Sequence, residues 1–328
     1  MDMSETDDVG ARRDEYARIR PLYEKLAPEI RDILTAKLAA AGLAPVSLSH
    51  RTKTLDSFET KIGRKGYTSP LSQTTDLAGV RVVCAYEAEL AKVAEIIGAA
   101  FDVRERIDKA LDLGADRMGY NGKAYVVRLG AGYAGGRYDG ITDLDCEIQV
   151  RTVLQDAWAL IAHQLVYKNE GSTPERLRRD LNNVASLLEI AQAVFDSVRE
   201  KREAYVSEIR QKENDRPAFL AQPLDFDTVM AYARWKFPQL DASERLTQML
   251  LRDIDVKHYP TLRELNAVVD RASLAVDAYR NENPEWFKTG TDFLTKSLGF
   301  VDQKFRAKHG FAARTRAAFD RFQSLVAK

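Results

Sequence analysis

The clearest pattern in the chain is the alternation of apolar and polar residues at 146–151, which read Cys-Glu-Ile-Gln-Val-Arg. In a strand, this alternation places a carboxylate, an amide and a guanidinium (Glu147, Gln149 and Arg151) in a row on one face. Thr152 can then cap a helix that runs to Tyr167, and the predicted core-facing stripe of that helix is Leu154, Trp158, Ile161 and Leu165. Solvated surface charge is the alternative for any single residue here, but so many polar groups together favour a site.

Similar patterns predict the other elements of the same unit. Apolar residues alternate or cluster at 46–50, within 76–86, at 101–106 and at 123–129, and we expect a strand in each segment. A helix is expected at 87–100. Residues 14–41 have apolar positions at three-to-four spacing, and Pro21 and Pro28 suggest that they form two short helices. The predicted fold class is α/β, with a mixed sheet of about five strands flanked by helices.

The same periodicity divides the chain into three parts. Residues 1–42 are N-terminal helices, and 43–213 form the α/β domain with a long closing helix from Pro174 to about Lys212. That helix is too long for one small core, so we expect it also to brace a homo-oligomer or the C-terminal part. Residues 215–224 look like a linker, and 214–328 form a helical accessory domain broken at Pro238, Pro260, Pro284 and Gly299.

Charge and composition narrow the function classes. The chain has 328 residues, and its 49 basic residues balance 49 acidic ones, so an anion site must be local. Cys84 and Cys146 both lie in apolar runs and are expected to be buried thiols in a reduced compartment. No apolar leader and no run of eighteen apolar residues is present, so we expect a cytoplasmic protein with no membrane partner.

One local cation cluster surrounds the start of the helix expected after Thr54. The strand before it delivers Arg51 and Lys53, and Ser57 and Lys61 lie one turn apart on one face of the helix. A hydroxyl and three cations near a helix N-terminus suit a polyphosphate. A solvated basic helix face is the alternative.

Two further residues are candidates for chemistry. Asp76 lies just before the start of the apolar strand expected within 76–86, where a carboxylate can present a metal ligand at a sheet edge or only cap a turn. Tyr120 lies between glycines at the entrance to the strand at 123–129, where its ring could stack on a base or belong to an ordinary turn.

Taken in order, these segments resemble the synthetase domain of the RelA/SpoT alarmone enzymes. The resemblance covers about residues 46–168 and rests on four blocks, which are Arg51-x-Lys53-x3-Ser57-x3-Lys61, Asp76-Leu77-x-Gly79-Val80-Arg81, Gly119-Tyr120, and Glu147-Ile148-Gln149-Val150-Arg151-Thr152 followed by AWA and H-x3-YK. It implies a nucleotidyltransferase-like fold and transfer of the β,γ-pyrophosphate of ATP to the 3′-hydroxyl of GDP or GTP.

The resemblance also implies a donor site for ATP. Arg51 and Arg81 would lie on either side of the adenine, and Lys53, Ser57 and Lys61 would bind the phosphates. Such transfer depends mainly on positioning and on charge stabilisation by cations.

The metal and acceptor sites implied by the resemblance complete the catalytic centre. Asp76 and Glu147 would hold Mg²⁺, and Glu147 would help to deprotonate the attacking hydroxyl. Tyr120 would stack on the acceptor base. The other residues assigned to the acceptor side are Gln149, Arg151, His163 and Lys168.

The chain departs from the family pattern in two respects. The family commonly has Gly-Tyr-x-Ser-x-His, whereas Gly122 and Ala124 stand in place of the Ser and the His. The donor site therefore looks complete, and the acceptor is the open question. No His-Asp pair precedes the synthetase region, so we expect no alarmone hydrolase activity.

The leading hypothesis is a Mg²⁺-dependent GTP/GDP pyrophosphokinase that makes (p)ppGpp. One alternative is a toxin that pyrophosphorylates the 3′ CCA end of tRNA, although the neutral net charge does not favour a tRNA partner. A second alternative is an inactive nucleotide-binding regulator. The presence of both metal carboxylates and all the donor-side cations argues against it. The sequence does not decide the acceptor, the role of residues 214–328, the oligomeric state or the activating signal.

Overall fold

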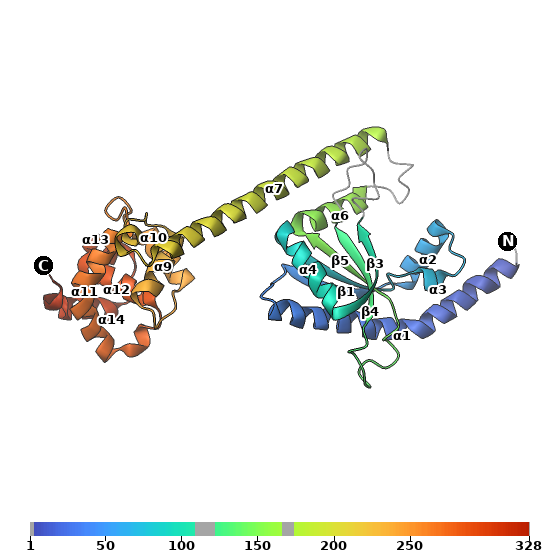
Figure 1. The fold of residues 1–328 in the computed structure, drawn as a ribbon, viewed down its shortest axis with the longest axis horizontal. Coiled ribbons are helices and arrows are strands. Elements are labelled where there is room, and N and C mark those ends of the chain that lie inside the picture. The colour runs from blue at the N-terminus through green and yellow to red at the C-terminus, as the bar shows by residue number, and fades with distance from the viewer. Residues whose placement is uncertain (1–2, 109–121, 166–173, 328) are drawn as a thin grey trace. The chain divides into compact units, whose positions relative to one another are not determined.

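The structure is a computed structural model that describes residues 3–108, 122–165 and 174–327. The chain separates into two compact units, Met1–Val198 and Arg199–Lys328, and each is described by itself (Figure 1). The three-part division expected from the sequence stays a prediction.

The first unit contains the sheet. Its elements in chain order are α1 Met3–Ala40, β1 Ser47–Thr52, α2 Leu55–Lys65, α3 Pro70–Gln73, β2 Ala78–Cys84, α4 Glu87–Ala100, β3 Phe101–Asp108, β4 Lys123–Leu129, β5 Cys146–Thr152, α6 Val153–Leu165 and the first part of α7 Glu175–Lys212.

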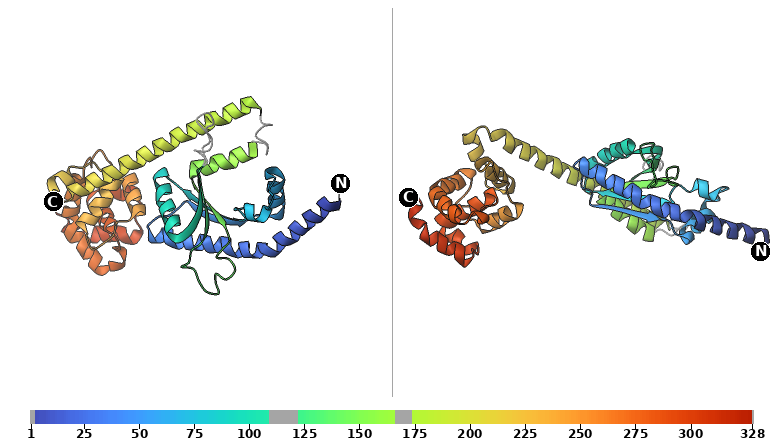
Figure 2. Two further views of the ribbon diagram at one scale, coloured as in Figure 1. Left: turned by 45° about the vertical axis from the view of Figure 1, so that its right-hand side comes forward. Right: turned by 90° about the horizontal axis from the view of Figure 1, so that it is seen from below.

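The strands of the described residues form one mixed sheet in the order β1-β2-β5-β4-β3. Strands β2 and β5 pair in parallel, and the other neighbours pair antiparallel. The apolar side of β5 is buried with residues of β2, α1 and α4 in one core, so α1 and α4 cover one face of the sheet. Figures 1 and 2 show α1 running alongside the sheet. The predicted α/β class with about five strands is confirmed.

Helix α1 corrects the expectation of two short helices, because it is continuous with Pro21 and Pro28 inside it. Each proline in a helix interior costs about 3 kcal/mol. The helix also buries an apolar face against the sheet, and burying each large apolar side chain contributes about 1.5–3 kcal/mol. The buried side chains on that face are Tyr23, Leu26, Ile30, Leu34 and Leu38. Tertiary packing therefore outweighs the two breaks in helical hydrogen bonding.

The apolar stripe expected on α6 is only partly buried. Trp158 packs against Ala185 of α7, with Leu154 partly buried beside them, whereas Ile161 and Leu165 are exposed. Ile161 and Leu165 are therefore wrong as core residues of the described structure. On the following helix, α7, the apolar side chains of Leu177, Val184, Phe195 and Val198 are also exposed. The predicted homo-oligomer stays a prediction.

The second unit is helical from Arg199 onward. After the end of α7 its elements are α8 Arg216–Leu220, α9 Phe226–Lys236, α10 Glu244–Asp253, α11 Leu262–Glu282, the 3₁₀ helix η2 Pro284–Trp286, α12 Gly290–Val301, α13 Gln303–Lys308, α14 Ala313–Arg321 and the 3₁₀ helix η3 Gln323–Leu325.

Two expectations about this unit are wrong. The segment read as a linker contains α8, and its Phe219 is fully buried, so the segment belongs to the core. Gly299 does not break a helix but lies inside α12, where the ring of Phe319 packs directly against it. A glycine chosen for close packing resembles a helix breaker in the sequence.

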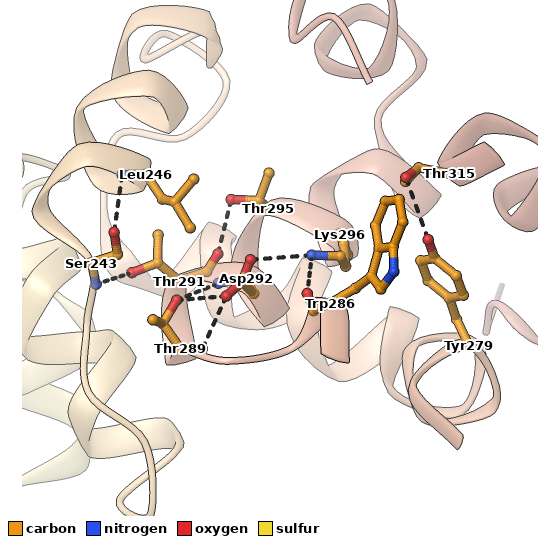
Figure 3. Close-up of polar contacts among 10 residues, drawn as sticks. All are labelled: Ser243, Leu246, Tyr279, Trp286, Thr289, Thr291, Asp292, Thr295, Lys296 and Thr315. Carbon is orange, nitrogen blue, oxygen red and sulfur yellow. Dashed lines mark hydrogen bonds and ion pairs between the residues drawn. The ribbon is translucent and has the colours of Figure 1, made fainter. Parts of the chain in front are cut away.

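The interior of the second unit contains a buried ammonium group (Figure 3). Lys296 donates a hydrogen bond of 2.7 Å to the carbonyl of Trp286 and lies 3.2 Å from Asp292 Oδ1. Burial lowers its pKa, and the ion pair with Asp292 partly offsets that effect. Asp292 also accepts from Thr289 in a capping box at the start of α12. Because its donors have partners, we assign Lys296 a structural role.

Both cysteines, Cys84 and Cys146, are buried free thiols, as expected from the sequence. Burial raises the pKa of Cys84 to about 11, so this thiol is not activated. In the described part of the chain, no helix has the length and apolar character needed to cross a membrane.

Candidate active site

The register of the sheet brings residues from three strands into two rows. Arg51 of β1 lies opposite Gly79 of β2, and Gly79 lies opposite Glu147 of β5. One step along, Arg81 lies opposite Gln149. Directly paired residues project from the same face of a sheet. The polar face of β5 and the functional positions of β1 and β2 therefore form one surface.

This surface borders a cavity of about 270 Å³. Its lining residues are Ser49, His50, Arg51, Asp76, Gly79, Val80, Arg81, Glu147 and Gln149. Five residues predicted from the sequence meet there, from segments nearly a hundred positions apart. Sequence reasoning did not select Ser49 or His50, which line the same cavity from β1, because neither has a distinctive spacing.

Gly79 makes the close approach of Arg51 possible. A Cβ atom at this position would lie 3.5 Å from both Cγ and Nε of Arg51, so the arginine side chain extends directly over the glycine. A side chain larger than a methyl group at position 79 would occupy the space of the guanidinium. The small residue between two charged ones is thus part of the site.

Asp76 is bonded to both lysines of the predicted phosphate site. Lys53 Nζ lies 2.6 Å from one carboxylate oxygen, and Lys61 Nζ lies 2.8 Å from the other. Burial alone would raise the pKa of Asp76, but the hydrogen bonds and charges of the two lysines outweigh it and lower that pKa. The aspartate is therefore ionised at neutral pH and shares two cations.

Helix α2 carries the second of these lysines. Thr54 caps the helix by accepting from the Ser57 backbone, and the Thr54 hydroxyl also bonds to that of Ser57. Ser57 is exposed and is not among the described residues that line the cavity. Its predicted contact with phosphate stays a prediction.

Glu147 and Gln149 are linked on the polar face of β5, because Gln149 Nε2 donates a hydrogen bond to Glu147 Oε1. The amide thus orients the carboxylate predicted to act on metal and acceptor. Both side chains are partly accessible, whereas the alternating Cys146, Ile148 and Val150 are buried.

Asp156 is a site residue that the sequence reasoning missed. Its Oδ1 atom lies 3.1 Å from Nη1 of Arg81 and 3.5 Å from Nη1 of Arg151. Burial lowers the pKa of Arg151, and the neighbouring charge of Arg81 lowers it further. The charge of Asp156 raises that pKa and partly offsets both effects. Asp156 lies in the first turn of α6, where a carboxylate is favoured, and that placement was the available signal. It holds both guanidinium groups on the polar side of the sheet.

The acceptor side is only partly described. Tyr120 and Lys168 lie outside the described residues, and His163 is an exposed residue of α6 that does not line the cavity. Ala124 is buried and lies opposite Gln149. An imidazole at this position, as the family pattern has it, would therefore enter the row that holds Gln149.

Gly122 packs against Arg151 without room for a side chain. A Cβ atom there would lie 2.3 Å from Arg151 Cγ and 2.5 Å from the carbonyl oxygen of Val150. The serine of the family pattern cannot be placed here unless Arg151 and the strand move. The glycine that replaces the family's serine at position 122 is thus required by the position of Arg151.

We expect Gly122→Ser to lower the free energy of unfolding by roughly 1–3 kcal/mol, the usual cost of overpacking. Urea unfolding would measure it, with Gly132→Ser as the control because a Cβ at Gly132 meets nothing within 4 Å. Equal stability of the two variants would contradict the close packing.

The carboxylates present suit a magnesium ion that is shared with a nucleotide. Mg²⁺ is usually held by one or two carboxylates together with substrate phosphates and water. Asp76 and Glu147 supply two carboxylates on one cavity. In the described ranges, no three His, Cys, Asp or Glu side chains form a metal cluster of their own. The donor set therefore fits a metal that enters with a polyphosphate.

Comparison with known proteins places this site in a family. Residues 50–172 match the family model described as "Region found in RelA / SpoT proteins". Residues 50–172 form a RelA/SpoT domain. The matched residues include five that line the cavity, namely Arg51, Asp76, Arg81, Glu147 and Gln149, and the two lysines paired with Asp76. The resemblance seen in the sequence is therefore confirmed.

Two curated relatives carry the same region. The chain is 24% identical over 141 residues to the GTP pyrophosphokinase YwaC of Bacillus subtilis, covering 42% of this chain and 65% of that protein. It is 26% identical over 196 residues to the GTP pyrophosphokinase YjbM of the same organism, covering 59% of this chain and 91% of that protein. The chain thus spans slightly less than two thirds of the first relative.

A solved structure confirms the fold around the RelA/SpoT domain. The small alarmone synthetase 1 of Bacillus subtilis bound to its product pppGpp superposes with a TM-score of 0.50 at 22% identity, covering 57% of this chain and 98% of that chain. At this identity the likeness concerns the fold.

Proposed function

We propose that the protein is a Mg²⁺-dependent pyrophosphokinase that transfers the β,γ-pyrophosphate of ATP to the 3′-hydroxyl of GDP or GTP. The observation that carries this proposal is the single cavity at which Arg51, Asp76, Arg81, Glu147 and Gln149 meet. The likeness of the chain to two GTP pyrophosphokinases supports the same reaction class.

ATP binding would exchange the partners of the two lysines. In the structure, Lys53 and Lys61 both neutralise Asp76. A triphosphate would offer both ammonium groups new anionic partners, and the freed carboxylate of Asp76 would join Glu147 in holding Mg²⁺. The bound metal would neutralise phosphate charge during transfer. Nucleotide and metal are therefore expected to bind together.

The arginines would position the adenosine end of the donor. Arg81 is fixed by Asp156, and Arg51 extends over Gly79 at the edge of the same cavity. Planar guanidinium groups stack well on aromatic rings. An adenine between the two would direct the phosphates toward the lysines of α2 and the β1–α2 connection.

The chemical step needs one base and one leaving group. The acceptor 3′-oxygen attacks the β-phosphorus of ATP, and its proton passes to the carboxylate of Glu147. The bond between the β-phosphorus and the oxygen that bridges it to the α-phosphorus breaks, and AMP leaves with that oxygen. Gln149, bonded to Glu147, holds the carboxylate toward the acceptor. No covalent enzyme intermediate is required.

The proposal is tested by supplying γ-labelled ATP and Mg²⁺ with GDP, GTP, deacylated tRNA or no acceptor. We expect label on GDP and GTP as new tetra- and pentaphosphates. Label only on tRNA, with a yield that falls steeply between low and physiological salt, would instead support the toxin alternative. Absence of label from every acceptor, with ATP bound, would support an inactive nucleotide-binding regulator.

A further inference from the structure

Tyr16 on α1 contacts the donor site from outside the matched residues 50–172. Its side chain is 1% exposed, and its ring stacks on Phe58 of α2 with centroids 4.7 Å apart and planes 16° from parallel. The Tyr16 hydroxyl donates a hydrogen bond to the backbone carbonyl of Lys53. Burial raises the pKa of Tyr16, so the hydroxyl remains protonated at neutral pH.

Lys53 lies in the short connection between β1 and α2, one residue past the end of β1. Its N–H donates to the carbonyl of Leu77, 2.8 Å away, and its carbonyl accepts from Tyr16. Its ammonium group reaches Asp76, the residue before Leu77. The two backbone bonds therefore hold the connection from both sides and determine where the side chain begins.

A second contact joins the same two helices. Arg13, one turn before Tyr16, forms a two-point ion pair with Glu59, next to Phe58 on α2. The pair is substantially exposed, so we assign it little energy. It nevertheless shows that α1 and α2 also meet one turn before Tyr16, with the Tyr16–Phe58 stack as the buried part of the contact.

We propose that Tyr16 is a positioning residue for the ATP site, which acts by holding the Lys53 backbone so that its ammonium group meets the donor phosphates. This inference rests on the proposed function. It makes α1 part of the donor site of this chain, although the described side chains of α1 are not among those that line the cavity.

The test is Tyr16→Phe, which keeps the ring on Phe58 and removes only the hydroxyl. We expect the KM for ATP to rise about three- to tenfold, the value of one hydrogen bond, while the KM for the acceptor stays within about twofold. Binding of a non-hydrolysable ATP analogue should weaken by the same factor. The matched control is Tyr23→Phe on the same helix, where the backbone carbonyl, not the hydroxyl, meets Thr52 of β1.

Three results would overturn the inference. The first is an unchanged ATP KM and analogue affinity in Tyr16→Phe, and the second is an equal rise of the ATP KM in Tyr23→Phe. The third is an equal loss of affinity for ATP and for the acceptor together with lower stability, which would indicate a merely structural residue. Analogue binding needs no turnover, so an inactive wild-type protein would contradict the proposed function and leave this test in place. If Tyr16→Phe does not fold, Phe58→Leu, which breaks the stack but keeps the hydroxyl, should show the same selective loss of ATP affinity.

Discussion

Replacing Glu147 by Gln is expected to lower pyrophosphate transfer at least ~10²-fold while the protein stays folded. The glutamine keeps the length and shape of the side chain, and its carbonyl oxygen can still accept the hydrogen bond from Gln149. It cannot take a proton from the acceptor or balance the charge of a metal ion. Turnover at saturating ATP and GDP measures the effect, and thermal unfolding reports the fold.

The matched control for Glu147→Gln is Glu105→Gln, at an exposed position of edge strand β3. The control should retain wild-type turnover. Near wild-type turnover by a folded Glu147→Gln protein would exclude Glu147 as base and as metal ligand.

Truncating either lysine of the donor site is expected to weaken ATP binding about 10- to 150-fold without changing the affinity for the acceptor. A hydrogen bond to a charged group contributes roughly 1.5–3 kcal/mol, which corresponds to that range. The side chains of Lys53 and Lys61 are only 10% and 19% exposed, so water screens them less than surface charges. Each single alanine variant leaves the other lysine on Asp76, which protects the fold.

Titration of Lys53→Ala and Lys61→Ala with an ATP analogue and with GDP measures both affinities. Lys65→Ala, an exposed lysine in the last turn of α2, removes the same charge from the same helix and should bind ATP normally. If all three variants bind ATP as the wild type does, the basic face of α2 is only a solvated surface.

The strands could be predicted closely because their signal is local. The alternation at 146–151 corresponds to β5, and the helix expected at 87–100 has those bounds in the structure. Site residues on strands could be predicted for the same reason, since alternation decides the face and register then brings Arg51, Gly79 and Glu147 together.

The remaining features depend on contacts between distant segments. Two prolines suggested a break in α1, and only packing on the sheet keeps the helix continuous. The roles of Asp156 and Tyr16 arise from partners on other elements, and no sequence spacing indicates these roles. Sequence periodicity likewise reports that α7 has an apolar side but not what covers it.

The proposed reaction transfers an intact pyrophosphoryl group, and the position of the label in the product distinguishes it from transfer of a single phosphoryl group. Two parallel reactions would contain GDP and Mg²⁺ with ATP labelled at either the β- or the γ-phosphate. We expect that both labels enter the guanosine product in equal amounts and that one AMP appears per product formed. Entry of the γ-label alone, with ADP as the second product, would identify an ordinary kinase and contradict pyrophosphoryl transfer.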